Sequence, residues 1–244
     1  MKQHEAVIAA MDSKGGFATF AQLYQDVLKI PGCEWKTKTP FASIRRIVQD
    51  QRFFFRIKPG LWGLKSRKDE ILKSLAIDSK SPKDRKDEFN HTYYQGLLVE
   101  IGNLKGYKTF VPYQDKNKRY LSRPLSEYSN LKSMVEFSHP KIIRIAISVD
   151  VSWFNERDLP DSFFEVEHTT DINRSLSKFL DLQDFNARFN VVADKVRKRE
   201  FGQKIQGSSF KPIRERVRFI DYDNLSGYHA KIFELHELQK EISL

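Results

Sequence analysis

Acidic residues lie inside an apolar, strand-like stretch of this sequence, where carboxylates are uncommon. The stretch reads Phe163-Phe164-Glu165-Val166-Glu167. Because successive side chains of a strand point to opposite faces, we expect Glu165 and Glu167 on one face of a sheet and Val166 on the other. Two adjacent carboxylates repel each other, and burying them without a partner is costly. A cation is therefore expected beside them, with a solvent-facing strand edge paired with arginines as the alternative.

A third acid, Asp150, precedes Glu165 by fifteen positions and belongs to the longest apolar run of the chain, Ile142 to Trp153. The run predicts a strand, with the acid at the end of its apolar core. If this strand neighbours the one that carries Glu165, the carboxylates form an oxygen-only ligand set, which suits a hard ion such as Mg²⁺. Such ions lower the pKa of bound water and neutralise the charge that develops in phosphodiester hydrolysis. The pattern predicts a metal-dependent phosphodiesterase site.

Other candidate motifs are weaker. Pro160-Asp161 lies four residues before Glu165, a loop distance, so we prefer Asp150 as the first acid. His168 directly follows Glu167 on the opposite face and is expected to be structural or a DNA contact. The six histidines are scattered, without the close pairing of a zinc site. The single cysteine, Cys33, excludes an internal disulfide framework.

The composition sets the outer limits. A chain of 244 residues holds one large domain, or a medium domain with a small one attached. The net charge of +10 favours a polyanionic partner. The N-terminal residues lack the apolar core of a signal peptide, and no run approaches the length of a membrane span, so we expect a cytoplasmic protein without membrane contact.

Residues 1–66 predict a small domain of three helices and a β-hairpin, the order of a winged helix. The predicted helices cover residues 4–11, 17–30 and 40–50, and the hairpin strands cover 53–57 and 61–64. The segment has 11 Lys and Arg against 5 Asp and Glu, and so carries +6 of the total charge. We favour DNA as its partner over a protein-interaction role. The expected DNA contacts are Lys36, Lys38, Arg45, Arg46, Gln49, Arg56 and Lys58.

Four short pieces of this segment carry a family resemblance. They are Phe17-Ala18-Thr19-Phe20, Trp35-Lys36-Thr37-Lys38-Thr39-Pro40, Ser43-Ile44 and Pro59-Gly60-Leu61-Trp62-Gly63-Leu64. Together they resemble the HARE-type helix-turn-helix, a winged helix found in chromatin proteins, in an RNA polymerase subunit and fused to bacterial restriction enzymes. The resemblance implies a DNA-binding domain.

The remaining chain predicts a charged linker over 67–88, with a helical extension at 69–76, and then an α/β domain over 89–244. Helices and strands alternate there, which implies a central mixed sheet flanked by helices. The predicted helices are 92–104, 125–135, 170–185, 195–205 and 228–242. The predicted strands are 107–112, 142–153, 163–167, 189–193 and 217–222, and residues 114–123 are expected to form a loop.

The order of these elements, between Phe89 and Tyr222, resembles the PD-(D/E)xK nuclease superfamily, the core of most type II restriction enzymes. The resemblance implies that Asp150, Glu165 and Glu167 bind one or two Mg²⁺ ions, with Glu100 as an additional ligand. Glu167 stands where the superfamily most often has lysine, and Glu-x-Glu is a minority form of its motif.

Lys178, on the helix after Glu167, is the candidate for a phosphate contact, with an ordinary surface lysine as the alternative. Phe164-Glu165-Val166-Glu167-His168-Thr169-Thr170-Asp171 and Leu176-Ser177-Lys178-Phe179 also resemble a group of restriction-type nucleases fused to HARE domains.

We therefore expect a Mg²⁺-dependent endonuclease of the type II restriction kind that cuts duplex DNA at a specific site. Since cutting both strands usually takes two active sites, a homodimer is expected. The alternative is a DNA-binding regulator or modified-base reader whose nuclease-like domain is only a scaffold.

Overall fold

The computed structural model describes residues 1–241, which fall into two compact units. One unit joins residues 1–85 to the C-terminal segment that begins at Ser226, and the other is Lys86–Leu225. The sequence-based boundaries differ, because residues 67–88 are not simply a linker. Helix α4 (Lys68–Ser74) packs against the N-terminal sheet, and helix α5 already begins at Lys83.

The N-terminal unit contains the predicted helices and hairpin. Strand β1 (Phe17–Thr19) pairs with β3 (Leu61–Leu64), which pairs with β2 (Phe54–Lys58), all antiparallel. The predicted helix 17–30 starts late because Thr19 and Gln22 form a capping box that fixes the first turn at Phe20. Pro40 opens the third helix as expected, but the Thr39 side chain makes no capping bond. The helices are α1 (Gln3–Asp12), α2 (Phe20–Asp26), the 3₁₀ turn η1 (Val27–Lys29) and α3 (Pro40–Ile47).

A five-stranded mixed sheet forms the centre of the second unit, with the order β10-β9-β8-β7-β4. Strands β8, β9 and β10 are parallel to one another, while β7 and β4 run antiparallel. This confirms the predicted fold class, an α/β (α+β) architecture with a central mixed sheet. The strands are β4 (Lys108–Phe110), β7 (Val151–Phe154), β8 (Pro160–Glu167), β9 (Arg188–Ala193) and β10 (Val217–Asp221).

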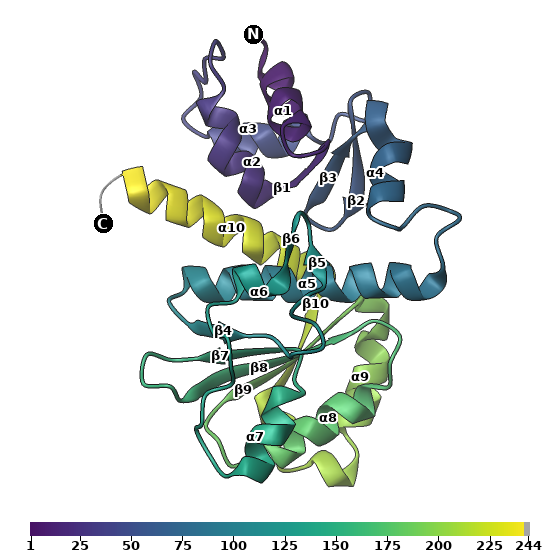
Figure 1. The fold of residues 1–244 in the computed structure, drawn as a ribbon, viewed down its shortest axis with the longest axis vertical. Coiled ribbons are helices and arrows are strands. Elements are labelled where there is room, and N and C mark those ends of the chain that lie inside the picture. Colours follow the sequence, from purple (N-terminus) through teal and green to yellow (C-terminus); the bar gives the residue numbers. More distant parts are fainter. Residues whose placement is uncertain (242–244) are drawn as a thin grey trace. The chain divides into compact units, whose positions relative to one another are not determined.

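Helices cover both faces of this sheet (Figure 1). Helix α5 (Lys83–Leu104) lies on one face, and its Gly102 lets the backbone approach Trp153, since an added Cβ would stand 2.6 Å from the indole nitrogen. The other face packs an apolar cluster that includes Phe163, Phe179 and Phe189. That face is covered by α7 (Pro140–Ile147), α8 (Ile172–Asp181) and α9 (Lys198–Ile205).

The prediction of a strand over 142–153 was wrong. The run divides into helix α7 and strand β7, with Asp150 just before the strand. Pro140 occupies the first helical turn, and Ile142, Ile143 and Ala146 recur at helical spacing against the core cluster. The first part of the apolar run therefore forms a half-buried helix that packs its isoleucines against the core, and a short apolar run alone cannot distinguish such a helix from a strand.

Smaller differences concern the connecting segments. The helix predicted over 125–135 shortens to α6 (Leu125–Tyr128), and the predicted loop 114–123 contains the first strand of a small pair, β5 (Arg119–Tyr120) with β6 (Arg123–Pro124). The C-terminal helix α10 spans Tyr222–Glu241, so residue 242 of the predicted helix lies outside the described residues. Within residues 1–241, every helix is too short or too polar to cross a membrane.

Candidate active site

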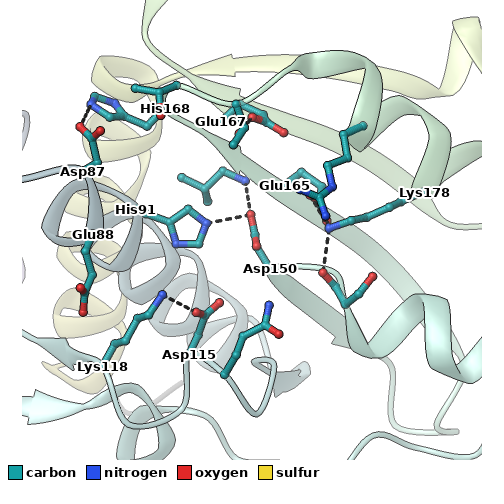
Figure 2. Close-up of a pocket in the computed structure, with 16 residues that line it drawn as sticks. Asp87, Glu88, His91, Asp115, Lys118, Asp150, Glu165, Glu167, His168 and Lys178 are labelled. Atoms are coloured by element: carbon teal, nitrogen blue, oxygen red, sulfur yellow. Dashed lines mark hydrogen bonds and ion pairs between the residues drawn. The ribbon is translucent and has the colours of Figure 1, made fainter. Parts of the chain in front are cut away.

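A pocket of about 520 Å³ in the second unit collects the acids of β8, Asp150 and polar residues of α5 and α8 (Figure 2). Its walls come from four places in the chain: α5, the segment before β5, the α7–β7 junction and the end of β8 with α8. The lining residues include Asp87, Glu88, His91, Asp115, Lys118, Ser148, Asp150, Glu165, Glu167, His168, Arg174 and Lys178.

Glu165 and Glu167 share one face of β8, as predicted, since the hydroxyl of Ser175 donates to both carboxylates. Their surroundings differ. Glu165 accepts two hydrogen bonds from Lys178 Nζ, at 2.8 and 2.9 Å. Glu167 accepts bonds from the hydroxyls of Thr170 and Ser175. Both acids are buried, and only Glu165 has a bonded cation within hydrogen-bond distance, which separates their chemical roles.

Asp150 is held from two sides. Its Oδ2 accepts a bond of 2.7 Å from the backbone N–H of Val166 and lies 3.1 Å from His91 Nε2. Its backbone carbonyl accepts a bond of 3.1 Å from the side-chain amide of Gln95. The junction between α7 and β7 thus brings the acid to β8, although Asp150 directly precedes strand β7 and does not lie within it.

The acids influence each other's protonation. Burial raises the pKa of Glu165, and the nearby charge of Asp150 raises it further, against the effect of Lys178. Burial alone would also raise the pKa of Asp150, but the charge and hydrogen bond of His91 and the Val166 N–H outweigh it, so the pKa of Asp150 is lowered. The pair therefore holds one firmly ionised carboxylate beside one that resists ionisation, a charge distribution that a cation would relieve.

The predicted ligand Glu100 is not placed at this site. Its Oε2 accepts a bond of 2.7 Å from the hydroxyl of Tyr120, and it is absent from the described residues that line the pocket. Glu100 lies nine positions beyond His91 on α5, so the helix carries it away from the acids. Lys178, in contrast, is brought directly to Glu165 and also donates to the carbonyl of Ser148.

Several pocket residues were missed by the sequence interpretation. His91 contacts Asp150, and buried Asp115 pairs with Lys118 at 2.7 Å. His168, expected to be structural or a DNA contact, lies at the pocket with its Nε2 3.1 Å from Asp87 Oδ1. One signal could have revealed the helical wall, because Asp87, His91 and Gln95 recur every four residues on a helix whose other face is apolar.

The donor set is compatible with a hard divalent ion. Among residues 1–241, no three Asp, Glu, His or Cys side chains stand together as a complete protein ligand set. Mg²⁺ is commonly held by one or two carboxylates, with waters and substrate phosphates completing its octahedron. Asp150 and Glu165, buried and mutually repelling, supply that number of carboxylates. The residues fit the ion in this reduced form, with Asp150 and Glu165 as its ligands.

The residues expected to contact DNA lie in the N-terminal unit, and they differ in how far their side chains are exposed. Arg45 is half-buried and donates to the hydroxyl of Tyr24 and to Glu234, the latter at 2.6 Å. Lys58 is half-buried at the end of β2. The exposed ones are Lys36, Lys38, Arg46, Gln49 and Arg56.

The mixed sheet has buried carboxylates and a bonded lysine at one pocket, a set of groups that is compatible with a hard cation and a phosphate. Comparison with known protein families assigns the chain to one of them. The model of the type II restriction enzyme NmeDI C-terminal domain matches residues 74–242, and the chain belongs to that family. The match includes every pocket residue.

A curated relative, the type II restriction enzyme NmeDI of Neisseria meningitidis serogroup C, is 25% identical over 113 residues. The alignment covers 42% of this chain and 32% of the relative, so the chain spans about a third of the relative's length. No solved structure matches the chain.

Proposed function

We propose that the protein is a metal-dependent endonuclease of the type II restriction kind, which hydrolyses phosphodiester bonds of duplex DNA at a specific site. The observation that carries the proposal is the arrangement of Asp150, Glu165 and Lys178 in one pocket, two buried carboxylates beside a lysine that is bonded to one of them. Membership in a restriction-enzyme family supports it. We further propose that the unit of residues 86–225 is of the PD-(D/E)xK kind, because α5, β4, β7, β8, α8 and β9 follow its order.

The acids and two basic residues of the pocket have distinct roles under this proposal. Asp150 and Glu165 would hold Mg²⁺, which would supply the Lewis acidity that lowers the pKa of bound water and neutralises charge on the phosphate. Lys178 replaces the motif lysine in space, since it reaches the second acid from α8, and it orients the scissile phosphate. Arg174, exposed one turn before Lys178 at the pocket, is suited to an adjacent phosphate.

Glu167 has a supporting role in this scheme. Thr170, Ser175 and Arg197 surround its carboxylate, with the Arg197 guanidinium at 3.9 Å. These partners fasten the end of β8 to α8 and to the 3₁₀ turn η3 (Lys195–Arg197). Glu167 enters the ligand set only if those contacts are released.

Two further parts of the proposal concern DNA recognition. The N-terminal unit acts as a HARE-type winged helix on DNA, a role supported by its element order and its exposed basic residues. Cutting both strands of a duplex calls for two pockets, so the active form is a homodimer.

The second candidate is a DNA-binding regulator or modified-base reader in which the pocket is only a scaffold. Two observations favour it: no three acids converge within residues 1–241, and Glu167 is already occupied by protein partners. Cleavage separates the two candidates, because a reader binds DNA without cutting it.

The test is to incubate the purified protein with modified and unmodified plasmid and phage DNAs, in Mg²⁺ and in EDTA. We expect discrete fragments in Mg²⁺ alone, whose ends give the recognition site. Glu165→Ala should bind DNA but not cut, which excludes a contaminating nuclease. Asp161→Asn is the matched control, since Asp161 lies on the same strand, pairs with Arg188 and should keep full cutting. Tight binding without cutting on every DNA would favour the reader.

A further inference from the structure

Helix α5 contacts Asp150 at two points that lie one helical turn apart, and Figure 2 shows the first of them, the contact of His91. His91 Nε2 lies 3.1 Å from the carboxylate oxygen Oδ2, and the amide nitrogen of Gln95 donates to the backbone carbonyl at 3.1 Å. Residues four apart on a helix project to the same side, so both contacts come from one face of α5. A side chain and its own carbonyl are thus fixed by a single rigid element.

The two bonds to the carboxylate fall on the same oxygen. Val166 N–H and His91 Nε2 both approach Oδ2, and no described residue donates to Oδ1. A carboxylate held by two donors at one oxygen cannot rotate freely, and it keeps its second oxygen available for a ligand. His91 can donate this bond in its neutral form with the proton on Nε2, so a charged ring is not required.

The hydrogen bonds of Gln95 indicate that its contact with Asp150 is not the arrangement of lowest free energy for this side chain. Its amide nitrogen donates to two acceptors, the Asp150 carbonyl and Asp115 Oδ2, which fixes the orientation of the amide. Its Oε1 is consequently buried without a hydrogen-bond partner among residues 1–241. Leaving a buried acceptor unsatisfied is unfavourable, and such exceptions are expected where function constrains the residue.

We propose that His91 is a positioning residue, which together with Gln95 clamps Asp150 from α5 so that Oδ1 is presented to the divalent ion. The inference rests on the proposed function. Hydrogen-bond partners of metal ligands orient them, and removing such a partner typically weakens metal affinity by about 10- to 100-fold. The clamp also explains how the first acid is aligned although it precedes its strand instead of lying within it.

The test compares two amides at position 91 in the full-length protein without DNA. His91→Gln extends an amide nitrogen to about the place of Nε2, whereas His91→Asn is one methylene shorter and cannot reach Oδ2. Both are polar and similar in their demands on folding, and thermal melting checks this. MnCl₂ binding, measured by calorimetry, is the readout, with Glu165→Ala to locate the ion and His139→Asn, at an exposed histidine, as the surface control.

We expect His91→Asn to weaken Mn²⁺ affinity by about 10- to 100-fold while His91→Gln and His139→Asn stay near the wild type. Wild-type affinity in His91→Asn would overturn the inference and leave the proposed function intact. Equal losses in both position-91 variants would also overturn it, because the hydrogen bond would not be the cause. No Mn²⁺ binding by the wild type without DNA would also overturn the inference, and the cleavage test in Mg²⁺ would then decide the proposed function separately.

Discussion

Three carboxylates are buried in the pocket of the unit formed by residues 86–225, whereas most basic residues of the N-terminal unit lie at its surface. Asp150, Glu165 and Glu167 are 8%, 4% and 3% exposed. In the N-terminal unit, Lys36 pairs with Glu34 while both side chains are at least 80% exposed. Exposed pairs change the stability of a fold very little, but buried acids lower it unless they are compensated.

Because of this difference in the burial of charged side chains, the two regions give evidence of different strength about function. Surface lysines and arginines are compatible with DNA, yet a soluble fold tolerates them without any partner. Buried acids such as Glu165, whose pKa is raised by its burial and by the charge of Asp150, are retained against the stability of the fold, which makes the pocket a stronger indicator of chemistry.

The largest effect is expected at Lys178. Burial raises the pKa of Glu165 to about 8, so above that pH Lys178→Met removes the bonded cation of an ionised carboxylate, and the unfolding free energy should fall by about 3 kcal/mol. The cutting rate at saturating DNA should fall by about 10²- to 10³-fold, the usual loss for a preorganised electrostatic contact. Denaturant unfolding and single-turnover cleavage measure the two effects.

Two control variants show whether the losses come from the burial of the ion pair. Lys36→Met makes the same substitution beside an exposed partner and should leave both stability and cutting unchanged. The double variant Glu165→Gln with Lys178→Met removes both charges, so it should regain most of the stability but none of the cleavage. If Lys178→Met were as stable as the wild type, the contact with Lys178 would not be what compensates the buried Glu165 carboxylate.

A second prediction concerns the helix that forms one pocket wall. Gly102→Ala places a Cβ 2.6 Å from both Thr109 and Trp153, so α5 must shift, at about 1–3 kcal/mol of unfolding free energy. Gly202→Ala on α9 meets nothing within 4 Å and should stabilise by about 0.5–1 kcal/mol. Equal stabilities, measured by denaturant unfolding, would show that α5 is not closely packed on the sheet.

The sequence predicted the chemistry of the pocket better than its architecture. Alternation along a strand is a local property, so the shared face of Glu165 and Glu167 followed directly from their spacing. The helical position of Lys178 was also local, and the structure brings it to Glu165. The run that contains Asp150 was misassigned, because burial of α7 against the core is a tertiary effect that an isoleucine-rich run does not encode.

Long-range contacts were beyond the sequence for a related reason. His91 and Asp150 are 59 positions apart, and only the packing of α5 on the sheet brings them together. Glu100 is an acid on the same helix as His91, but its side chain leaves the helix in a direction that brings it to the hydroxyl of Tyr120. The residue type predicts which chemistry a side chain can perform, and the packing of the fold decides where in the structure that side chain lies.

A third prediction turns to the N-terminal unit. Arg46 is exposed on α3, so Arg46→Ala should weaken DNA binding uniformly across sequences and reduce the salt dependence of log K by about 1. The cutting rate at saturating DNA should not change, because the pocket is untouched. Binding measured over a series of salt concentrations gives the slope, and an unchanged slope would remove α3 from the DNA interface.

The smallest effect is expected at Glu234. This acid pairs with Arg45, a basic residue of the N-terminal unit that is half-buried and not exposed. Within this unit, Glu234 of α10 pairs with Arg45 of α3 at 2.6 Å, and Ser226 of the same helix donates to the carbonyl of Pro59 at the hairpin turn. The C-terminal helix therefore reaches both elements expected to meet DNA.

Glu234→Gln weakens the ion pair with Arg45, so DNA affinity should rise modestly and the salt dependence of log K should steepen by about 1. Gly227→Ala, on the same helix in open space, is the control for helix stability. If Glu234→Gln binds DNA as the wild type does, Arg45 serves to attach α10, and the basic residues that reach DNA are those that the structure leaves exposed.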